Sequence, residues 1–265
     1  MMWIAAIGET AETQVGYVGG LALLLGRSLR ALILSPLKRG RMFQRAIHQG
    51  MAAGVTAIPI VSLITFFVGV IVALQGAYEL QRLGAMGMIP TVVAISITRE
   101  LGPLITAVVV IGRSGSAFAA ELGTMRVTEE LDALETMALD PVAFLVAPKL
   151  LAMAVMMPCL TIWSDLMGVL GGCLFGVVGG GFSLGGYLIA TSEALLFRDL
   201  SSGCIKSLVF GMVITAVGCH EGFSTGAGAE AVGRSTTRAV VLSLALLVLS
   251  DLLFTILFYV ARGVR

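Results

Sequence analysis

A few charged side chains lie inside stretches of sequence that are otherwise apolar, and they are the best candidates for chemistry. Arg99 and Glu100 are adjacent in one such stretch. Lys206 and Asp251 lie in two others. A charged side chain at the centre of a membrane-spanning helix costs about 2.5–3.5 kcal/mol, so it usually pairs with another charge or lines a wet cavity. We expect Lys206 to pair with Glu100, and the set predicts either a polar binding pocket or an ion-pair lock between helices.

Motifs of familiar enzymes are missing from the sequence or lack their structural context. There is no Walker A pattern, no HExxH and no CxxC, so no metal or cofactor is expected in this chain. If ATP drives this protein, another chain must bind it together with Mg²⁺. Residues 222–226 match GxSxG, with Ser224 at the centre and His220 just upstream. A nucleophile elbow needs a strand before the serine, and no sheet is predicted. We expect a non-enzymatic chain; an intramembrane enzyme using Ser224 and His220 is the competing hypothesis.

The composition indicates that membrane-spanning helices position these charges. Hydrophobic residues make up 57% of the 265 positions, charged residues make up 12%, and the mean hydropathy is +0.99. A soluble domain is about 25% charged, so this chain has too little polar surface to be one. Apolar runs at 55–74, 142–178 and 239–260 reach the length of about 20 residues that crosses a bilayer. They are continuous rather than alternating, which predicts helices and not a barrel.

The first 49 residues are expected to form a segment distinct from the membrane domain at 50–265. Six basic residues and no acidic ones lie between Arg27 and Arg45, beside apolar runs. This pattern predicts an amphipathic helix on an anionic membrane face, with a basic cytoplasmic segment after it. Glu9 and Glu12 argue against a signal peptide. The net charge of +1 gives no surface for nucleic acid.

The membrane domain is expected to contain five or six spans, and charge counting does not decide between these numbers. The expected spans cover about 50–78, 88–112, 142–181, 203–220 and 239–260. The stretch at 142–181 is either one long kinked helix or two tight ones. It also contains a glycine at every fourth position, which predicts a groove for helix packing. These glycines are Gly168, Gly172, Gly176 and Gly180.

The longest polar stretch, 113–141, contains apolar residues at roughly helical spacing among its acidic residues. We expect one short amphipathic helix over 121–139, ended before Pro141 and facing the cytoplasm. Its apolar face has no core of its own to bury it, which indicates a partner protein.

Several long motifs occur in a fixed order along the chain. They are TRELGP at 98–103, GRSGSA at 112–117, AELGTMRVTEELDAL at 120–134, CIKS at 204–207 and VGRSTTRAVV at 232–241. This arrangement resembles the MlaE family of ABC-transporter permeases, whose relatives include mycobacterial YrbE proteins and a chloroplast envelope permease. The resemblance extends from about residue 45 to the end of the chain.

The resemblance implies an all-α integral membrane protein with an N-terminal interfacial helix and five spans, similar to the exporter-type ABCG transporters. It implies a homodimer in the bacterial inner membrane that works with an MlaF-like ATPase, an MlaB-like STAS-domain protein and a periplasmic MlaD-like MCE ring. The implied function is ATP-driven movement of phospholipids between inner and outer membranes, which maintains outer-membrane lipid asymmetry. The alternatives are another lipid, such as a sterol or mycolate, and a membrane scaffold without transport.

The resemblance also implies roles for individual residues. A lipid cavity is expected at Leu74, Gln75, Arg99, Glu100 and Lys206. Residues 121–139 correspond to the family's coupling helix, which contacts the ATPase. The contact residues expected there are Glu121, Met125, Arg126, Glu129, Leu131, Asp132, Leu134 and Glu135. Asp165 and the loop at 222–231 have no assigned role.

Overall fold

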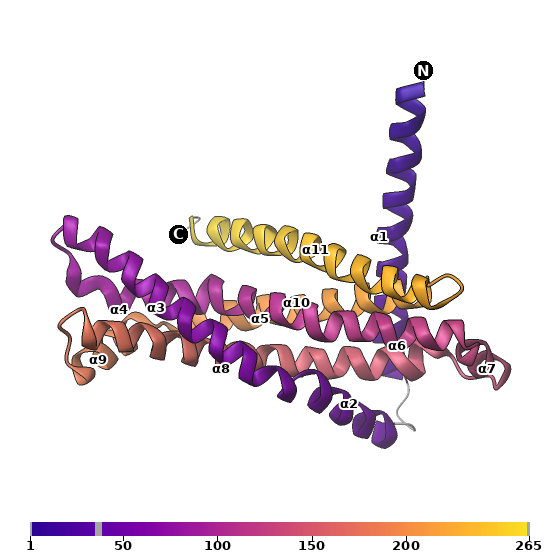
Figure 1. Cartoon of the computed structure of the whole chain (residues 1–265), viewed down its shortest axis with the longest axis horizontal. Helices are drawn as coiled ribbons and strands as arrows, with labels where there is room; N and C mark the ends of the chain where they lie inside the picture. The colour runs from indigo at the N-terminus through magenta and orange to yellow at the C-terminus, as the bar shows by residue number, and fades with distance from the viewer. Residues whose placement is uncertain (1, 35–38, 264–265) are drawn as a thin grey trace. The chain divides into compact units, whose positions relative to one another are not determined.

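The computed structural model describes residues 2–34 and 39–263, with side chains at 16–33 and 42–260. Helices make up the elements of this described part, and no strand occurs in it, so the all-α prediction is confirmed. Figure 1 shows the helices in chain order: α1 (Met2–Leu34), α2 (Arg39–Ala53), α3 (Ile58–Arg82), α4 (Ile89–Ser96), α5 (Gly102–Val110), α6 (Ser116–Val127), α7 (Glu130–Thr136), α8 (Ala147–Val178), α9 (Leu184–Ala194), α10 (Phe197–Phe223) and α11 (Ala229–Gly263).

Six helical stretches of the described chain are long and apolar enough to cross a membrane. They are Gly16–Ile33, Met42–Arg82, Met86–Val127, Val142–Val178, Phe197–Phe223 and Ala229–Val260. The stretch at 142–178 is one continuous helical segment, although Pro158 lies inside it, so the two-helix alternative is wrong. Five of these stretches correspond to the expected spans. The additional one, Gly16–Ile33, lies in the N-terminal segment that was expected to be interfacial. The interfacial placement stays a prediction, and so does the basic cytoplasmic segment. Lys38 and the side chains of Arg39 and Arg41 lie outside the described residues.

The single amphipathic helix expected over 121–139 is wrong. The second span continues through α6 to Val127, well beyond its expected end at residue 112, and a turn at Thr128 and Glu129 separates it from α7. Two β-branched residues in succession weaken the helix here, and the Thr128 hydroxyl bonds back to the Thr124 carbonyl at 3.1 Å. Glu129 has a φ of 60°, a left-handed conformation that ends a right-handed helix.

The chain forms two compact units, which we describe separately. Unit 1 comprises Met1–Gln49, Ser114–Ala152 and Met212–Ala245. Within it, α10 packs closely on α6 and the residue before it, and two glycines of α10, Gly218 and Gly222, make this close approach possible. A Cβ on Gly218 would lie 2.8 Å from the Gly115 carbonyl oxygen, and one on Gly222 would lie 2.6 Å from Leu122 Cβ. Leu122 is fully buried as a result, so part of the apolar face expected to need a partner is covered by the chain itself.

Unit 2 comprises Gly50–Arg113, Met153–Gly211 and Leu246–Arg265. Its core includes Ile89 and Val93 of α4 and Ile97, the next residue after that helix, packed against small residues of α3. Figure 1 shows α9 beside α4, at the same end of the unit as the connection between α3 and α4. Helices α3, α4 and α9 therefore pack together around the second half of α8.

The predicted glycine groove on α8 is present and takes side chains from two neighbouring helices. A Cβ on Gly168 would lie 2.8 Å from the Ile97 side chain. Gly172 faces Val93 in the same way, and Gly176 lies against the ring of Tyr187 from α9. The closest backbone approach uses Gly171, whose missing Cβ leaves room for the carbonyl of Phe66 in α3. Gly180 lies beyond the end of α8 at Val178 and is not part of the groove.

Candidate functional site

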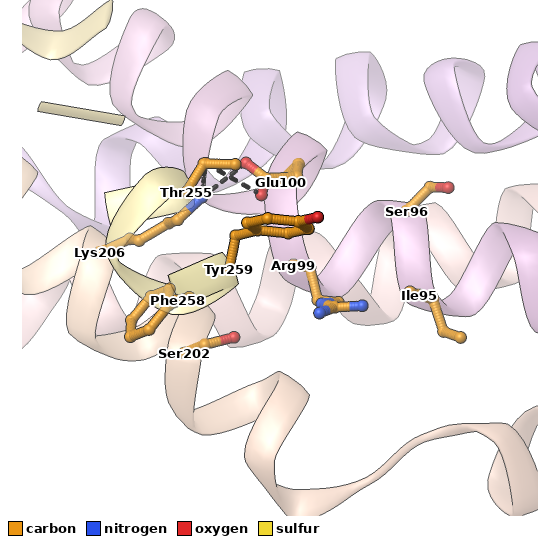
Figure 2. Close-up of a pocket in the computed structure, with 9 residues that line it drawn as sticks. All are labelled: Ile95, Ser96, Arg99, Glu100, Ser202, Lys206, Thr255, Phe258 and Tyr259. Atoms are coloured by element: carbon orange, nitrogen blue, oxygen red, sulfur yellow. Dashed lines mark hydrogen bonds and ion pairs between the residues drawn. The ribbon is translucent and has the colours of Figure 1, made fainter. Parts of the chain in front are cut away.

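Lys206 on α10 lies at the centre of a polar cluster within unit 2 (Figure 2). Its side chain is 1% exposed, and its Nζ donates to Glu100 Oε2 at 2.6 Å. The same Nζ lies 2.9 Å from Asp251 Oδ1 and donates to Thr255 Oγ1 at 3.1 Å. The Thr255 hydroxyl in turn donates to Glu100 Oε1 at 3.3 Å. The expected Lys206–Glu100 pair is confirmed, and two residues of α11 complete its surroundings.

This arrangement answers the cost of burying an ammonium group. An ammonium has three N–H donors, and three oxygens surround the one on Lys206. A buried charge is tolerated when it is paired and its remaining hydrogen-bonding capacity is used. One cation nevertheless faces two carboxylates, Glu100 and Asp251, and Glu100 keeps 44% of its side chain exposed.

Arg99 and Glu100 lie in a π-helical turn, Ile97–Leu101, that interrupts the second span. The cause is Pro103, which has no backbone N–H and whose ring would collide with the carbonyl four residues earlier in an α-helix. In the wider turn, the Gly102 N–H bonds to the carbonyl of Ile97, five residues back. The extra residue in the turn changes the directions of Arg99 and Glu100 and is the local reason that they reach the cluster.

The π-turn leaves one carbonyl without a helical donor. Thr98 precedes Pro103 by five residues, and proline has no N–H to donate. Gly203 of α10 lies directly against this carbonyl: a Cβ on Gly203 would lie 2.5 Å from the Thr98 oxygen, closer than a side chain can approach. The absence of a side chain at Gly203 thus lets α10 approach the turn and brings Lys206, three residues later, to Glu100.

Arg99 has a partner of its own within the same unit. Its Nε lies 3.3 Å from Asp199 Oδ1, and Asp199 is buried near the start of α10. The Arg99 side chain keeps 31% exposure. Arg99 and Glu100 are thus each fixed by an oppositely charged residue of α10, and each retains an exposed part.

These exposed parts line a cavity of about 290 Å³ (Figure 2). Its lining combines charged groups, hydroxyls and aromatic rings: Ile95, Ser96, Arg99, Glu100, Ser202, Lys206, Thr255, Phe258 and Tyr259. Charges and hydroxyls beside apolar side chains make a site for an amphipathic molecule.

Comparison with known proteins identifies the chain. The model of the family "Permease MlaE" matches residues 46–257. The chain belongs to the MlaE permease family. It is therefore a permease subunit of an ABC transporter and a multi-pass membrane protein.

Relatives of this MlaE-family permease cover nearly all of its length. A probable ABC transporter permease protein from Rickettsia bellii is 40% identical over 254 residues, 96% of each chain. The intermembrane phospholipid transport system permease protein MlaE of Haemophilus influenzae is 35% identical over 258 residues, 97% of each. The chloroplastic protein TRIGALACTOSYLDIACYLGLYCEROL 1 of Arabidopsis thaliana is 36% identical over 232 residues, 88% of this chain and 66% of the plant protein.

The permease brings three of the five expected cavity residues together. Arg99, Glu100 and Lys206 line the cavity, whereas Leu74 and Gln75 are exposed on α3 and are absent from its lining. Sequence reasoning missed the hydroxyls of Ser96, Ser202 and Thr255 and the aromatic rings of Phe258 and Tyr259. Such residues are common in apolar helices and gave no signal, whereas Asp199 was visible as an acid in an apolar region.

The expected ATPase-contact residues lie in unit 1, and several of them are engaged within the chain. Glu121 Oε2 accepts from Lys149 Nζ at 2.7 Å, and Lys149 is only 1% exposed. Arg126 and Asp132 pair at 2.7 Å across the turn between α6 and α7. The remaining set divides into buried and accessible members. Leu131 and Leu134 are buried, Met125 is half-buried, and Glu129 and Glu135 are exposed.

The GxSxG match of the permease lies at a helix end. Gly222 is inside the last turn of α10, and Ser224 lies in the turn that follows. His220 packs its ring on that of Tyr17, with centroids 4.8 Å apart. The strand that a nucleophile elbow requires does not occur among residues 2–34 and 39–263.

One buried acid of the permease packs against the end of the π-turn. Asp165 on α8 is 5% exposed, and its carboxyl oxygens have no hydrogen-bond partner among the described residues. It packs directly against Gly102, the residue that follows the π-turn, so that a Cβ at Gly102 would overlap Asp165 Oδ1. Burial of a carboxyl group without a partner costs free energy, most of all when it is charged.

Proposed function

We propose that this permease moves phospholipids between the inner and outer membranes of a bacterium, as the membrane subunit of an ATP-driven transporter that maintains outer-membrane lipid asymmetry. The cavity at Arg99 and Glu100 carries the proposal, because it offers charged groups and hydroxyls inside an apolar unit. A phospholipid headgroup needs such a site, and its acyl chains need apolar surface. The Haemophilus influenzae relative is named for intermembrane phospholipid transport, which supports this substrate class.

The size of the cavity indicates how a lipid would lie. A volume of about 290 Å³ suits a headgroup and not a whole phospholipid. The acyl chains would extend along apolar surface outside the cavity, and a second copy of the chain would enclose them. Lys206 holds Glu100 in place, while Arg99 and Glu100 contact the headgroup.

One proposed partner follows from what the sequence lacks, and the others follow from the likeness to the Mla system. It has no Walker A pattern, so a separate MlaF-like ATPase would bind ATP and Mg²⁺. The proposed complex also contains an MlaB-like STAS-domain protein and a periplasmic MlaD-like MCE ring that receives or delivers lipid. Closure of the ATPase dimer would move α6 and α7 and so change access to the cavity, which is rigid-body switching between two states.

The test is an affinity purification of the tagged permease from inner membranes in mild detergent, with mass spectrometry of the proteins and lipids recovered. We expect an ATPase chain, an MCE-domain protein and phospholipid to be recovered together. Glu100→Gln should lower the amount of bound phospholipid several-fold, whereas Glu79→Gln, the same change at an exposed position on α3, should not.

The competing functions give other results in the same experiment. A membrane scaffold would be recovered without an ATPase and without lipid, and Glu100→Gln would then change only stability. A permease for a sterol or mycolate would be recovered with an ATPase and with that lipid in place of phospholipid. Recovery of the permease alone would contradict the transport proposal.

A further inference from the structure

We infer that the cavity selects phospholipids whose headgroup carries an ammonium beside the phosphate, over phospholipids that are only anionic. This inference rests on the proposed function, since it concerns the same cavity. It follows from which charges of the cluster are accessible and which are already used.

Lys206 is the cation that would be expected to attract an anionic headgroup, but it is not accessible. Its side chain is 1% exposed, its ammonium donates to Glu100 and Thr255, and the Asp251 carboxylate lies 2.9 Å away as a third oxygen neighbour. The group that reaches the cavity beside it is the Glu100 carboxylate, with 44% of its side chain exposed. Together with Asp251, this part of the cluster has two carboxylates for one ammonium, so its accessible face is negative.

Glu100 lies among groups that favour a cationic ligand. Phe258 and Tyr259 line the same cavity, and aromatic faces attract ammonium groups through their quadrupoles. A carboxylate beside aromatic rings is a suitable site for a primary or quaternary ammonium. Figure 2 shows the Tyr259 ring in the same region as the carboxylate of Glu100.

Arg99 provides the complementary site for the phosphate. Its guanidinium is held through Nε by Asp199, and Figure 2 shows it turned away from Lys206, toward the side of Ser96. A guanidinium matches the geometry of phosphate with its paired donors. The hydroxyls of Ser96 and Ser202 line the cavity and are further donors.

Because Arg99 and Glu100 are adjacent in one π-turn, the cavity presents a cation and an anion side by side. A phosphoethanolamine headgroup places its phosphate and ammonium one short linker apart and can satisfy both residues. A phosphoglycerol headgroup satisfies Arg99 but brings no cation to Glu100.

The experiment uses the assembled transporter, incubated with vesicles that contain equal amounts of phosphatidylethanolamine and phosphatidylglycerol with identical acyl chains. The lipid retained after purification is quantified by mass spectrometry. We expect phosphatidylethanolamine to be retained about five-fold over phosphatidylglycerol, the preference that one partly exposed ion pair provides. Glu100→Gln should bring the ratio close to one, and Glu79→Gln should leave it unchanged. Arg99→Gln should lower the retention of both lipids.

The wild-type ratio is decisive even if Glu100→Gln fails to fold. Equal retention of the two lipids, or a preference for phosphatidylglycerol, would overturn this inference and leave the transport proposal intact. Retention of neither lipid by a complex that contains its ATPase would instead overturn the transport proposal.

Discussion

The ammonium of Lys206 lies 2.6 Å from the carboxylate of Glu100, although 106 positions separate the two residues in the sequence. The contact joins the π-turn of the second span to α10. Asp251 approaches the same ammonium from α11 at 2.9 Å, so three helical segments of unit 2 meet at one buried cation. The free energy of unfolding should therefore depend strongly on Lys206.

We expect Lys206→Met to destabilise the protein by about 3 kcal/mol, because it leaves two carboxylates facing each other without their cation. Partial exposure of Glu100 keeps the effect at the lower end of the range for buried pairs. The midpoint of thermal unfolding in detergent should fall by several degrees. Replacing Glu100 by Met as well should recover part of the loss, since only one unpaired carboxylate, that of Asp251, then remains. An unchanged midpoint in Lys206→Met would show that the pair does not hold the helices together.

The approach of α10 to the π-turn depends on Gly203, and this can be tested with one methyl group. In Gly203→Ala the new Cβ would lie 2.5 Å from the Thr98 carbonyl oxygen, so the helices must separate. We expect a loss of about 1–3 kcal/mol, typical of overpacking, measured as a lower unfolding midpoint. Gly76→Ala on α3 is the matched control, because its Cβ would meet nothing within 4 Å. The control should be neutral or stabilising by up to about 1 kcal/mol, and equal losses in both variants would contradict the close contact.

The sequence was sufficient to predict much of this site. Charges inside apolar helices usually pair or line a cavity, so the Lys206–Glu100 contact could be predicted from residue types alone. The glycine groove was also predictable from residue types, because small residues at helical spacing allow close packing of helices. The π-turn was not predictable, since Pro103 indicates only that an α-helix is disturbed, and not whether it kinks, ends or widens.

The region expected to contact the ATPase shows a different limit. Its apolar spacing predicted one helix, but local backbone chemistry at Thr128 and Glu129 divides it in two. Leu131 and Leu134 keep their helical spacing within α7, and both are buried within the chain. Spacing alone cannot distinguish a face that waits for a partner from one that the chain covers itself.

Tyr187 gives a prediction for alkaline pH. Its ring fills the groove beside Gly176, it is fully buried, and its hydroxyl has no hydrogen-bond partner among the described residues. Burial, followed by the nearby Cys173, raises the pKa of the Tyr187 hydroxyl above its ordinary value. The folded state therefore holds this proton more tightly than the unfolded state, and its contribution to stability is complete below about pH 10. As the pH rises above that value, the unfolded state ionises and the contribution is lost.

Tyr187→Phe removes this titration while keeping the ring in the groove. We expect unfolding midpoints of the variant and the wild type to run parallel up to about pH 9 and to diverge above about pH 10, with the variant losing less. The measurement is a series of thermal unfolding curves between neutral and alkaline pH. Curves that stay parallel throughout would contradict the effect of burial on this hydroxyl.

Glu121 and Lys149 connect α6 to the start of α8, and this link should transmit movement from the ATPase. Lys149 is 1% exposed with Glu121 Oε2 at 2.7 Å, so a shift of Glu121 must carry Lys149 with it or leave a buried ammonium unpaired. In Glu121→Gln we expect lipid transport by the reconstituted complex to fall about ten-fold, equivalent to about 1.4 kcal/mol of coupling free energy, while ATP hydrolysis persists. Glu79→Gln, the same change at an exposed position on α3, should affect neither. Exchanging the two charges, with Glu121→Lys and Lys149→Glu together, should restore part of the transport. If Glu121→Gln lowered hydrolysis and transport equally, the pair would serve assembly with the ATPase and not the transmission of its movement.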